Sequence, residues 1–190
     1  MNKEILIICR GGGDLATGIV HRLFRAGYQV LILETAEPAA IRRQVSFCEA
    51  VYEGTATVEG VTAERIYTAQ KQAVEEVLQR GRIPLLVDPD GRSIEVLKPD
   101  VVVDAIIAKK NLGTYKEMAP LVIGIGPGFV AGKDVHLVVE SMRGHNLARI
   151  LETGSALANT GIPGNIGGYT KERVIHAAAE GYMKNLHQIG

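Results

Sequence analysis

Short apolar runs and one amphipathic segment alternate at the start of the chain. Residues 4–10 and 29–34 are apolar and rich in isoleucine, leucine and valine, a pattern typical of parallel strands whose two faces are both covered. Between them, Leu15, Ile19 and Leu23 recur at helical spacing. The pattern predicts a β-turn-α-β unit of about thirty residues, the size of a mononucleotide-binding half.

The middle of the chain continues with one clear helix among weaker patterns. Over 69–79, Ala73, Val74, Val77 and Leu78 lie on one helical face, and a glycine follows as a stop signal. The other elements expected here are a helix over 38–44, extended pieces around 50–52 and 56–61, a strand over 83–87, a turn over 88–91 and a strand over 101–107. Strands that alternate with helices predict an α/β protein with a Rossmann-like parallel sheet.

Beyond about residue 112 the pattern changes to short apolar segments separated by glycines. The strands expected there cover 121–125, 134–142, 149–151 and 173–178. Short strands with frequent glycine turns indicate a small glycine-rich, β-rich C-terminal unit. We therefore predict two domains, a Rossmann-like dinucleotide-binding domain over 1–115 and a β-rich domain over 116–190.

The turn between the first strand and the first helix carries a glycine fingerprint. Its residues are Gly11, Gly12, Gly13, Asp14, Leu15 and Ala16. In the spacing G-x-G-x-x-A, Gly11 permits a tight exit from the strand, Gly13 lets a phosphate approach backbone N–H groups, and Ala16 lets the helix pack closely. The helix N-terminus adds partial positive charge and free N–H donors. The turn therefore predicts a site for a phosphate-bearing ligand.

Two acidic side chains bear on this prediction. Glu34 ends the second strand, where a carboxylate accepts hydrogen bonds from ribose hydroxyls and disfavours a 2′-phosphate. Asp14 is atypical, because a carboxylate beside a phosphate would repel it, and we interpret it as a cap of the helix N-terminus. The competing interpretation is a turn retained for packing, with no nucleotide bound.

A second group of polar residues belongs to the strand over 101–107 and the loop after it. Asp104 lies in an otherwise apolar run, so it needs a partner if it is buried. Lys109, Lys110 and Asn111 come at the carboxyl end of the strand, the edge where open α/β sheets bind ligands. Two interpretations stay open: an anion-binding loop, and a solvated lysine loop with Asp104 satisfied by the backbone.

The C-terminal half holds two further glycine-containing motifs. Residues 124–128 form a glycine cluster that no predicted helix follows, which favours a tight turn between strands over a phosphate loop. Around a later glycine, Glu140, Arg143 and His145 form a polar loop, in which the basic side chains could bind an anion and the carboxylate could orient one of them. Together with polar residues over 159–164, this loop is a candidate binding surface.

Composition narrows the function classes. The 190 residues include 21 basic and 21 acidic side chains, which argues against nucleic acid or an anionic membrane as a partner. Two cysteines without a CxxC pair, and histidines without metal-ligand spacing, predict neither a disulfide scaffold nor a metal site. We expect a soluble cytoplasmic protein, because neither a signal peptide nor a run of about 20 apolar residues is evident.

Five motifs occur in order along the chain, at 10–18, 103–111, 123–129, 140–145 and 159–164. In this order they resemble the accessory proteins of the selenium-dependent molybdenum hydroxylase system, a YqeB-like family. That family is distantly similar to the Rossmann part of the xanthine dehydrogenase maturation factors of the XdhC/CoxI type. The resemblance runs over nearly the whole chain. It implies a maturation role, in which the protein helps a labile selenium- or sulfur-bearing molybdenum cofactor to reach its hydroxylase.

The resemblance and the glycine turn together predict an accessory protein that binds an NAD-like ligand or a pterin dinucleotide. A molybdenum hydroxylase or other maturation proteins are the expected partners, and a homo-oligomer is a further option. An NAD-dependent oxidoreductase and an NAD-sensing binding protein stay open as alternatives. An oxidoreductase requires a general acid or base near the nicotinamide. Tyr67 and Lys71 match the spacing of the short-chain dehydrogenase pair but open a surface helix too early in the chain, so we interpret the match as chance.

Overall fold

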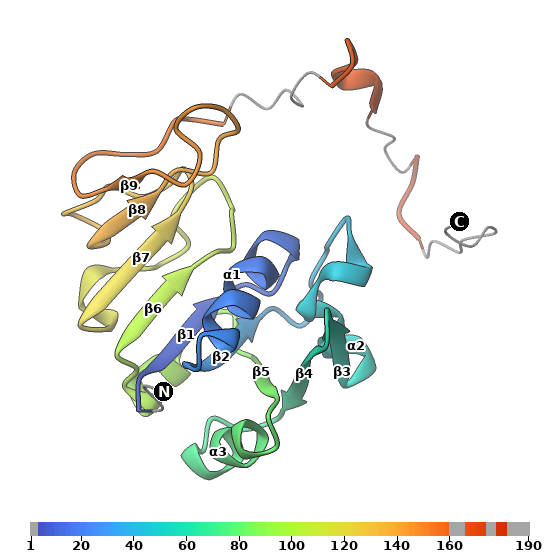
Figure 1. The fold of residues 1–190 in the computed structure, drawn as a ribbon, viewed down its shortest axis with the longest axis vertical. Helices are drawn as coiled ribbons and strands as arrows, with labels where there is room; N and C mark the ends of the chain where they lie inside the picture. The colour runs from blue at the N-terminus through green and yellow to red at the C-terminus, as the bar shows by residue number, and fades with distance from the viewer. Residues whose placement is uncertain (1–3, 160–165, 174–177, 182–190) are drawn as a thin grey trace. The chain divides into compact units, whose positions relative to one another are not determined.

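The computed structural model describes residues 4–159, 166–173 and 178–181. In this part of the chain, nine strands form one sheet in the order β3-β4-β5-β2-β1-β6-β7-β8-β9 (Figure 1). The strands are β1 (Leu6–Arg10), β2 (Gln29–Glu34), β3 (Thr55–Val58), β4 (Val61–Ile66), β5 (Ile83–Val87), β6 (Val101–Asp104), β7 (Leu121–Ile125), β8 (Leu137–Val139) and β9 (Ile150–Leu151). The protein is therefore an α/β protein with a mostly parallel, mixed sheet.

Parallel pairing dominates the middle of the sheet. β1 pairs in parallel with β2 on one side and with β6 on the other. Among the described strands, the pairs β3–β4 and β8–β9 at the two edges are antiparallel. The chain moves outward from β1 to β2 and later returns to β6 on the opposite side of β1. The carboxyl ends of β1 and β6 therefore flank a topological switch point.

Short helices cover both faces of this sheet. They are α1 (Asp14–Arg25), α2 (Ala50–Glu53), α3 (Lys71–Gln79) and α4 (Ser93–Leu97), with 3₁₀ turns η1 (Arg43–Val45), η2 (Phe47–Glu49) and η3 (Lys116–Met118). A further 3₁₀ turn, η4 (Lys171–Arg173), lies in the last part of the chain. Val20 of α1 is buried in one apolar cluster with Ile7 of β1, whereas Val74 of α3 is buried in another with Ile8. Successive side chains of a strand thus face two separate cores.

Several predicted elements are confirmed at or near their expected bounds. β2, β5 and β7 match the strands expected over 29–34, 83–87 and 121–125. α1 and α3 occupy the two segments with clear helical periodicity. These segments were predictable because β2 and β5 are nearly continuous buried apolar runs, whereas α1 and α3 bury apolar residues at helical spacing.

Two predicted elements between residues 38 and 52 are wrong. The helix expected over 38–44 is replaced by bends followed by η1, and Ile41 is fully exposed. A helix there would have no apolar face to bury, and a short helix is not stable without one. The extended piece expected around 50–52 is instead α2, in which Ala50 and Val51 are buried. A short apolar run does not distinguish a buried helix from a buried strand.

The strand predicted over 101–107 is shorter than expected. β6 ends at Asp104, and Ile107 has a φ of 58°, a left-handed conformation that no regular strand contains. The strand predicted over 134–142 likewise contracts to β8. Residues 105–120 therefore form a long loop between β6 and β7, which includes η3.

The strands expected for a separate C-terminal domain extend the same sheet. β7 pairs in parallel with β6, and β8 and β9 continue outward from it. Contacts divide the chain into units 1–158 and 159–190, so position 115/116 falls inside the first unit. The connections around β7 and β8 contain no α-helix, which is why their sequence pattern resembled a β-rich unit.

The second unit has few described elements. They include η4 and a bridge between Ile166 and Tyr169. The strand expected over 173–178 and the polar motif over 159–164 lie largely outside the described residues. In the part of the chain that is described, no helix is long and apolar enough to cross a membrane.

Candidate functional site

The glycine turn leaves β1 in a sharp bend that contacts two neighbouring segments. Gly11 has a φ of 100°, and a Cβ there would lie 3.0 Å from the carbonyl oxygen of Ala105. A Cβ on Gly12 would lie 3.1 Å from the backbone nitrogen of Cys48, whose N–H donates to the Gly12 carbonyl at 2.8 Å. Gly11 is thus required both by its positive φ and by the close approach of the Ala105 backbone. Gly12 is required by the close approach of the Cys48 backbone.

Gly13 differs, because its α-carbon faces open space. Its φ of −64° and ψ of 178° suit any residue, and no heavy atom lies within 4 Å of a Cβ built on it. Gly13 is the N-cap of α1. The missing side chain leaves room beside the first turn of the helix, where backbone N–H groups can bind an anion.

Glu34, at the end of β2, turns back toward the glycine turn. Its Oε1 accepts a hydrogen bond from the Gly12 N–H at 2.7 Å, and its Oε2 accepts one from the Thr35 N–H at 2.8 Å. These bonds hold the carboxylate in place and leave further lone pairs for other donors. The structure therefore brings Glu34 and the glycine turn together.

Asp14 is the first residue of α1 rather than its N-cap. Its Oδ1 accepts a hydrogen bond from the Leu15 N–H at 2.8 Å, so it satisfies a first-turn donor as a cap would. Its Oδ2 lies 2.6 Å from Nε and 2.5 Å from Nη2 of Arg42. The arginine offsets the negative charge that would repel a phosphate. Sequence reasoning missed it because the two residues are 28 positions apart.

A pocket of about 490 Å³ opens at this turn, within the size range of small-molecule sites. Its lining residues are Arg10, Gly11, Gly13, Asp14, Leu15, Ala16, Leu33, Glu34, Thr35, Pro38, Ala39, Ala40, Ile41, Cys48, Asp88, Pro89, Ala105, Ile106, Ile107 and Leu112. They follow the carboxyl ends of β1, β2, β5 and β6. The pocket therefore lies at the topological switch point.

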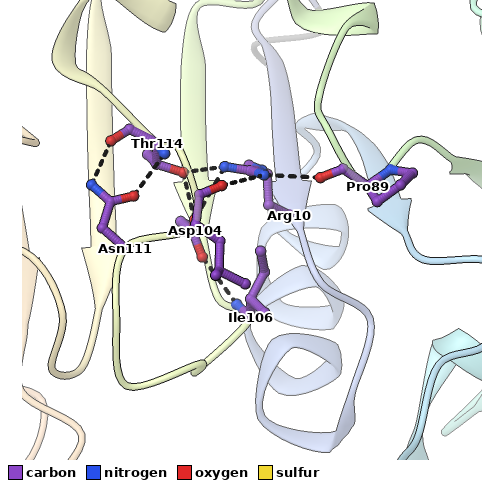
Figure 2. Close-up of polar contacts among 7 residues, drawn as sticks. Arg10, Pro89, Asp104, Ile106, Asn111 and Thr114 are labelled. Carbon is purple, nitrogen blue, oxygen red and sulfur yellow. Dashed lines mark hydrogen bonds and ion pairs between the residues drawn. The ribbon is translucent and has the colours of Figure 1, made fainter.

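Arg10, the last residue of β1, lines the pocket and is buried, with 2% of its surface exposed. Its Nη2 donates to the carbonyl oxygens of Pro89 at 3.0 Å and Leu112 at 3.3 Å. Its Nη1 donates to the Thr114 hydroxyl and lies 3.5 Å from Oδ2 of Asp104. Figure 2 shows the guanidinium between Asp104 and Thr114 on one side and Pro89 on the other.

Asp104 is therefore paired with a buried cation. Thr114 donates to its Oδ2 at 2.5 Å, and the Ile106 N–H donates to its Oδ1 at 3.1 Å. Asn111 exchanges two hydrogen bonds of 2.7 Å with the backbone of Thr114. Asp104 and Asn111 organise the loop after β6 and are not among the residues that line the pocket.

Lys109 and Lys110 lie exposed on that same loop, outside the pocket lining. Lys109 has a φ of 63°. The backbone of Lys110 contacts Gly128 so closely that a Cβ built on Gly128 would lie 2.8 Å from the Lys110 carbonyl carbon. The glycine cluster over 124–128 thus allows two loops to approach each other. It follows β7 without a helix, which agrees with the predicted tight turn.

The polar loop around residue 144 is organised differently from the prediction. Glu140 is buried, and its carboxylate accepts hydrogen bonds from the backbone N–H groups of Met142 at 2.7 Å and Leu157 at 2.8 Å. It therefore holds the backbone rather than orienting Arg143 or His145. Both basic residues are exposed and lie outside the pocket lining.

Two buried thiols and one carboxyl group at or near the pocket have shifted pKa values. Burial, reinforced by the nearby Glu34 charge, raises the pKa of the Cys48 thiol to about 12. Burial also raises the pKa of Cys9, so both thiols stay protonated near neutral pH. Burial opposes ionisation of Asp88, but hydrogen bonds from Ser93, Arg92 and Gly91 outweigh it and lower the Asp88 pKa.

A metal site needs several ligand side chains close together. Within residues 4–159, 166–173 and 178–181, no group of three or more His, Cys, Asp or Glu side chains could hold a metal ion. The pocket offers backbone N–H groups and carboxylates for hydrogen bonding, and Arg42, although outside the lining, brings a positive charge to its edge through the ion pair with Asp14.

Comparison with known proteins adds one relative. The chain is 49% identical over 185 residues to "Uncharacterized protein YqeB" of Escherichia coli (strain K12). The match supports a YqeB-like family. It covers 97% of this chain but 34% of that protein, so the chain spans about a third of the length of YqeB. No protein-family model and no solved structure matched the chain. This similarity agrees with the YqeB-like part of the predicted resemblance.

The residues that sequence reasoning missed are Arg10, Arg42, Asp88 and Thr114. Arg10 had a local signal, since it is a charged residue inside a motif otherwise made of strand and glycine turn. Its partners lie 79 to 104 positions away, and no local pattern identifies them. The sequence around Asp88 indicated only a turn. In the structure Asp88 accepts hydrogen bonds from the backbone N–H groups of Arg92 and Ser93 at the start of α4, a helix that was not predicted.

Proposed function

We propose that the pocket at the glycine turn binds a dinucleotide-type ligand, NAD-like or a pterin dinucleotide. The observation that carries the proposal is that Gly13, the start of α1 and Glu34 meet in one pocket. A phosphate placed beside Gly13 would meet backbone N–H donors at the positive end of the helix. A ribose placed beside Glu34 would donate its hydroxyls to a carboxylate that is already held in position.

The strand order supports this assignment. β5, β2, β1, β6 and β7 are parallel neighbours, with the reversal of order between β1 and β6, as in Rossmann-like doubly wound sheets. Ligands of such sheets bind outside the carboxyl ends of the strands at the switch point, where this pocket lies. The antiparallel β3–β4 hairpin is an addition at one edge and does not alter the switch point.

Arg42 makes the atypical Asp14 compatible with a phosphate. The Arg42 side chain is 63% exposed and meets the carboxylate with two nitrogens. An arginine in this place can turn its planar donor fork to a phosphate oxygen. The pair therefore presents a neutral rim rather than a negative one.

We further propose that the chain acts as an accessory protein in the maturation of a selenium-dependent molybdenum hydroxylase, with the hydroxylase or another maturation protein as its partner. The ordered motifs, through the resemblance that they carry, support this role. Binding is favoured over catalysis because the ionisable pocket side chains are engaged or buried. Glu34 and Asp88 accept backbone hydrogen bonds, Asp14 is paired, and Cys48 stays protonated.

The test combines identification of co-purifying molecules by mass spectrometry with titration calorimetry of NAD⁺, FAD and a pterin dinucleotide. Wild-type protein should bind one of these dinucleotides. Gly13→Asp should abolish the binding, because a carboxylate would occupy the phosphate position. Gly18→Asp is the matched control, since Gly18 is an exposed position of α1 with open space around it.

Two results would overturn the proposal. If wild-type protein binds none of the three dinucleotides, the pocket is not a dinucleotide site. If Gly13→Asp binds as well as wild type, the glycine turn is a packing feature. Turnover of NADH with a small carbonyl substrate would favour the oxidoreductase alternative over the accessory role.

A further inference from the structure

Arg10 is a buried cation that joins two walls of the pocket. Its Nη2 donates to the carbonyl of Pro89, in the turn after β5, and to that of Leu112, in the loop after β6. Both of these residues line the pocket. We propose that Arg10 is a positioning residue that sets the separation of the two walls, an inference that rests on the proposed dinucleotide site.

The guanidinium is fixed in place by its other partners. Nη1 donates to Thr114 and lies 3.5 Å from Asp104, whose carboxylate also accepts the Thr114 hydroxyl proton at 2.5 Å. A buried arginine is stable only when its donors are satisfied. One planar fork serves four partners here, an arrangement that the compact ammonium of lysine cannot reproduce.

The segment 105–112, in which residues 105–107 and 112 line the pocket and form this wall, needs such support. Ile107 lines the pocket with a φ of 58°, a costly conformation for a β-branched residue. The segment is held at its start by the bond from the Ile106 N–H to Asp104. Near its end, Leu112 is held by Arg10, and the adjacent Asn111 by Thr114. The cluster of Arg10, Asp104 and Thr114 therefore maintains a wall that local backbone preference would not.

This arrangement predicts different sensitivities for large and small ligands. A mononucleotide is held by the glycine turn and Glu34, on the β1–β2 side of the pocket. A dinucleotide extends across the switch point to the 105–112 wall. Displacement of that wall should therefore weaken the dinucleotide and spare the mononucleotide, whereas general structural damage would weaken both.

The experiment measures calorimetric affinities for NAD⁺, a pterin dinucleotide and AMP in Arg10→Lys, Thr114→Val and Thr114→Ser. Arg10→Lys and Thr114→Val should each weaken the dinucleotide by about tenfold, the equivalent of one net hydrogen bond, and leave AMP within about twofold. Thr114→Ser keeps the hydroxyl and should restore dinucleotide affinity. Arg65→Lys is the matched control, because Arg65 also donates to a backbone carbonyl, that of Val51, but lies outside the pocket lining.

Equal losses for AMP and the dinucleotide, or no loss for either, would overturn the positioning role while leaving the proposed site intact. Failure of wild-type protein to bind any dinucleotide would overturn the proposed function and this inference with it. If Arg10→Lys does not fold, the comparison of Thr114→Val with Thr114→Ser decides the matter, since the two differ in the hydroxyl that links Arg10 to Asp104.

Discussion

Gly11 and Gly13 are two residues apart in one turn, yet alanine should lower the stability of the protein at Gly11 and its ligand affinity at Gly13. At Gly11 the φ of 100° and the 3.0 Å approach of the Ala105 carbonyl to a new Cβ both oppose a side chain. Strained backbone conformations of this kind cost about 1–3 kcal/mol. Gly11→Ala should therefore lower the free energy of unfolding by at least that amount.

At Gly13 two small effects nearly cancel. Replacing glycine at a normal φ stabilises a protein by about 0.4–1 kcal/mol, because the unfolded chain loses freedom. Alanine is a poorer N-cap than glycine, which costs about 0.5–1 kcal/mol. With open space around its Cβ, Gly13→Ala should stay within about 0.5 kcal/mol of wild type in stability.

For Gly13→Ala, the effect on ligand affinity should be larger than the effect on stability. The new methyl group would stand where a phosphate approaches the first turn of α1. Loss of one hydrogen bond to a charged group costs about 1.5–3 kcal/mol, so dinucleotide affinity should fall by roughly 10- to 100-fold. Urea denaturation and titration calorimetry on the same preparations measure the two effects. Unchanged affinity in Gly13→Ala, or a stability loss equal to that of Gly11→Ala, would refute the reasoning.

Three further outcomes are expected. Glu34→Ala should weaken dinucleotide binding by about 1–3 kcal/mol through loss of a charge-assisted ribose contact, and calorimetry showing no change would exclude that contact. Because the Asp88 pKa is lower in the folded protein than its ordinary value of 3.8, Asp88 contributes stability above pH 3.8 that is lost as pH falls through the folded pKa. Asp88→Asn should therefore make the free energy of unfolding, measured by urea titrations, less dependent on pH in this acid range. Parallel curves for both proteins would contradict this expectation. Gly128→Ala should destabilise the protein by about 1–3 kcal/mol in the same assay, because φ is 116° and the Lys110 backbone leaves no room; wild-type stability would show that the two loops separate freely.

The local chemistry of the site could be predicted from the sequence. The β-turn-α-β unit, the glycine turn and Glu34 are read from contiguous residues, because strand and helix periods and turn preferences act over short distances. The structure places Gly11, Gly13 and Glu34 around one pocket, as that pattern indicates. The predicted domain boundary at 115/116 rested on weaker evidence, because the glycine-rich connections around β7 and β8 have the same sequence pattern as the turns of a small β-rich unit.

What the tertiary structure decided is which distant residues meet. The sequence by itself determined the elements around the turn, but nothing in it paired Arg10 with Asp104, which is 94 positions away, or Asp14 with Arg42. The order of strands brings β6 beside β1 and so buries both charges together. Burial then requires each charge to find a partner, and this long-range requirement, rather than any local preference, shapes the wall opposite the glycine turn.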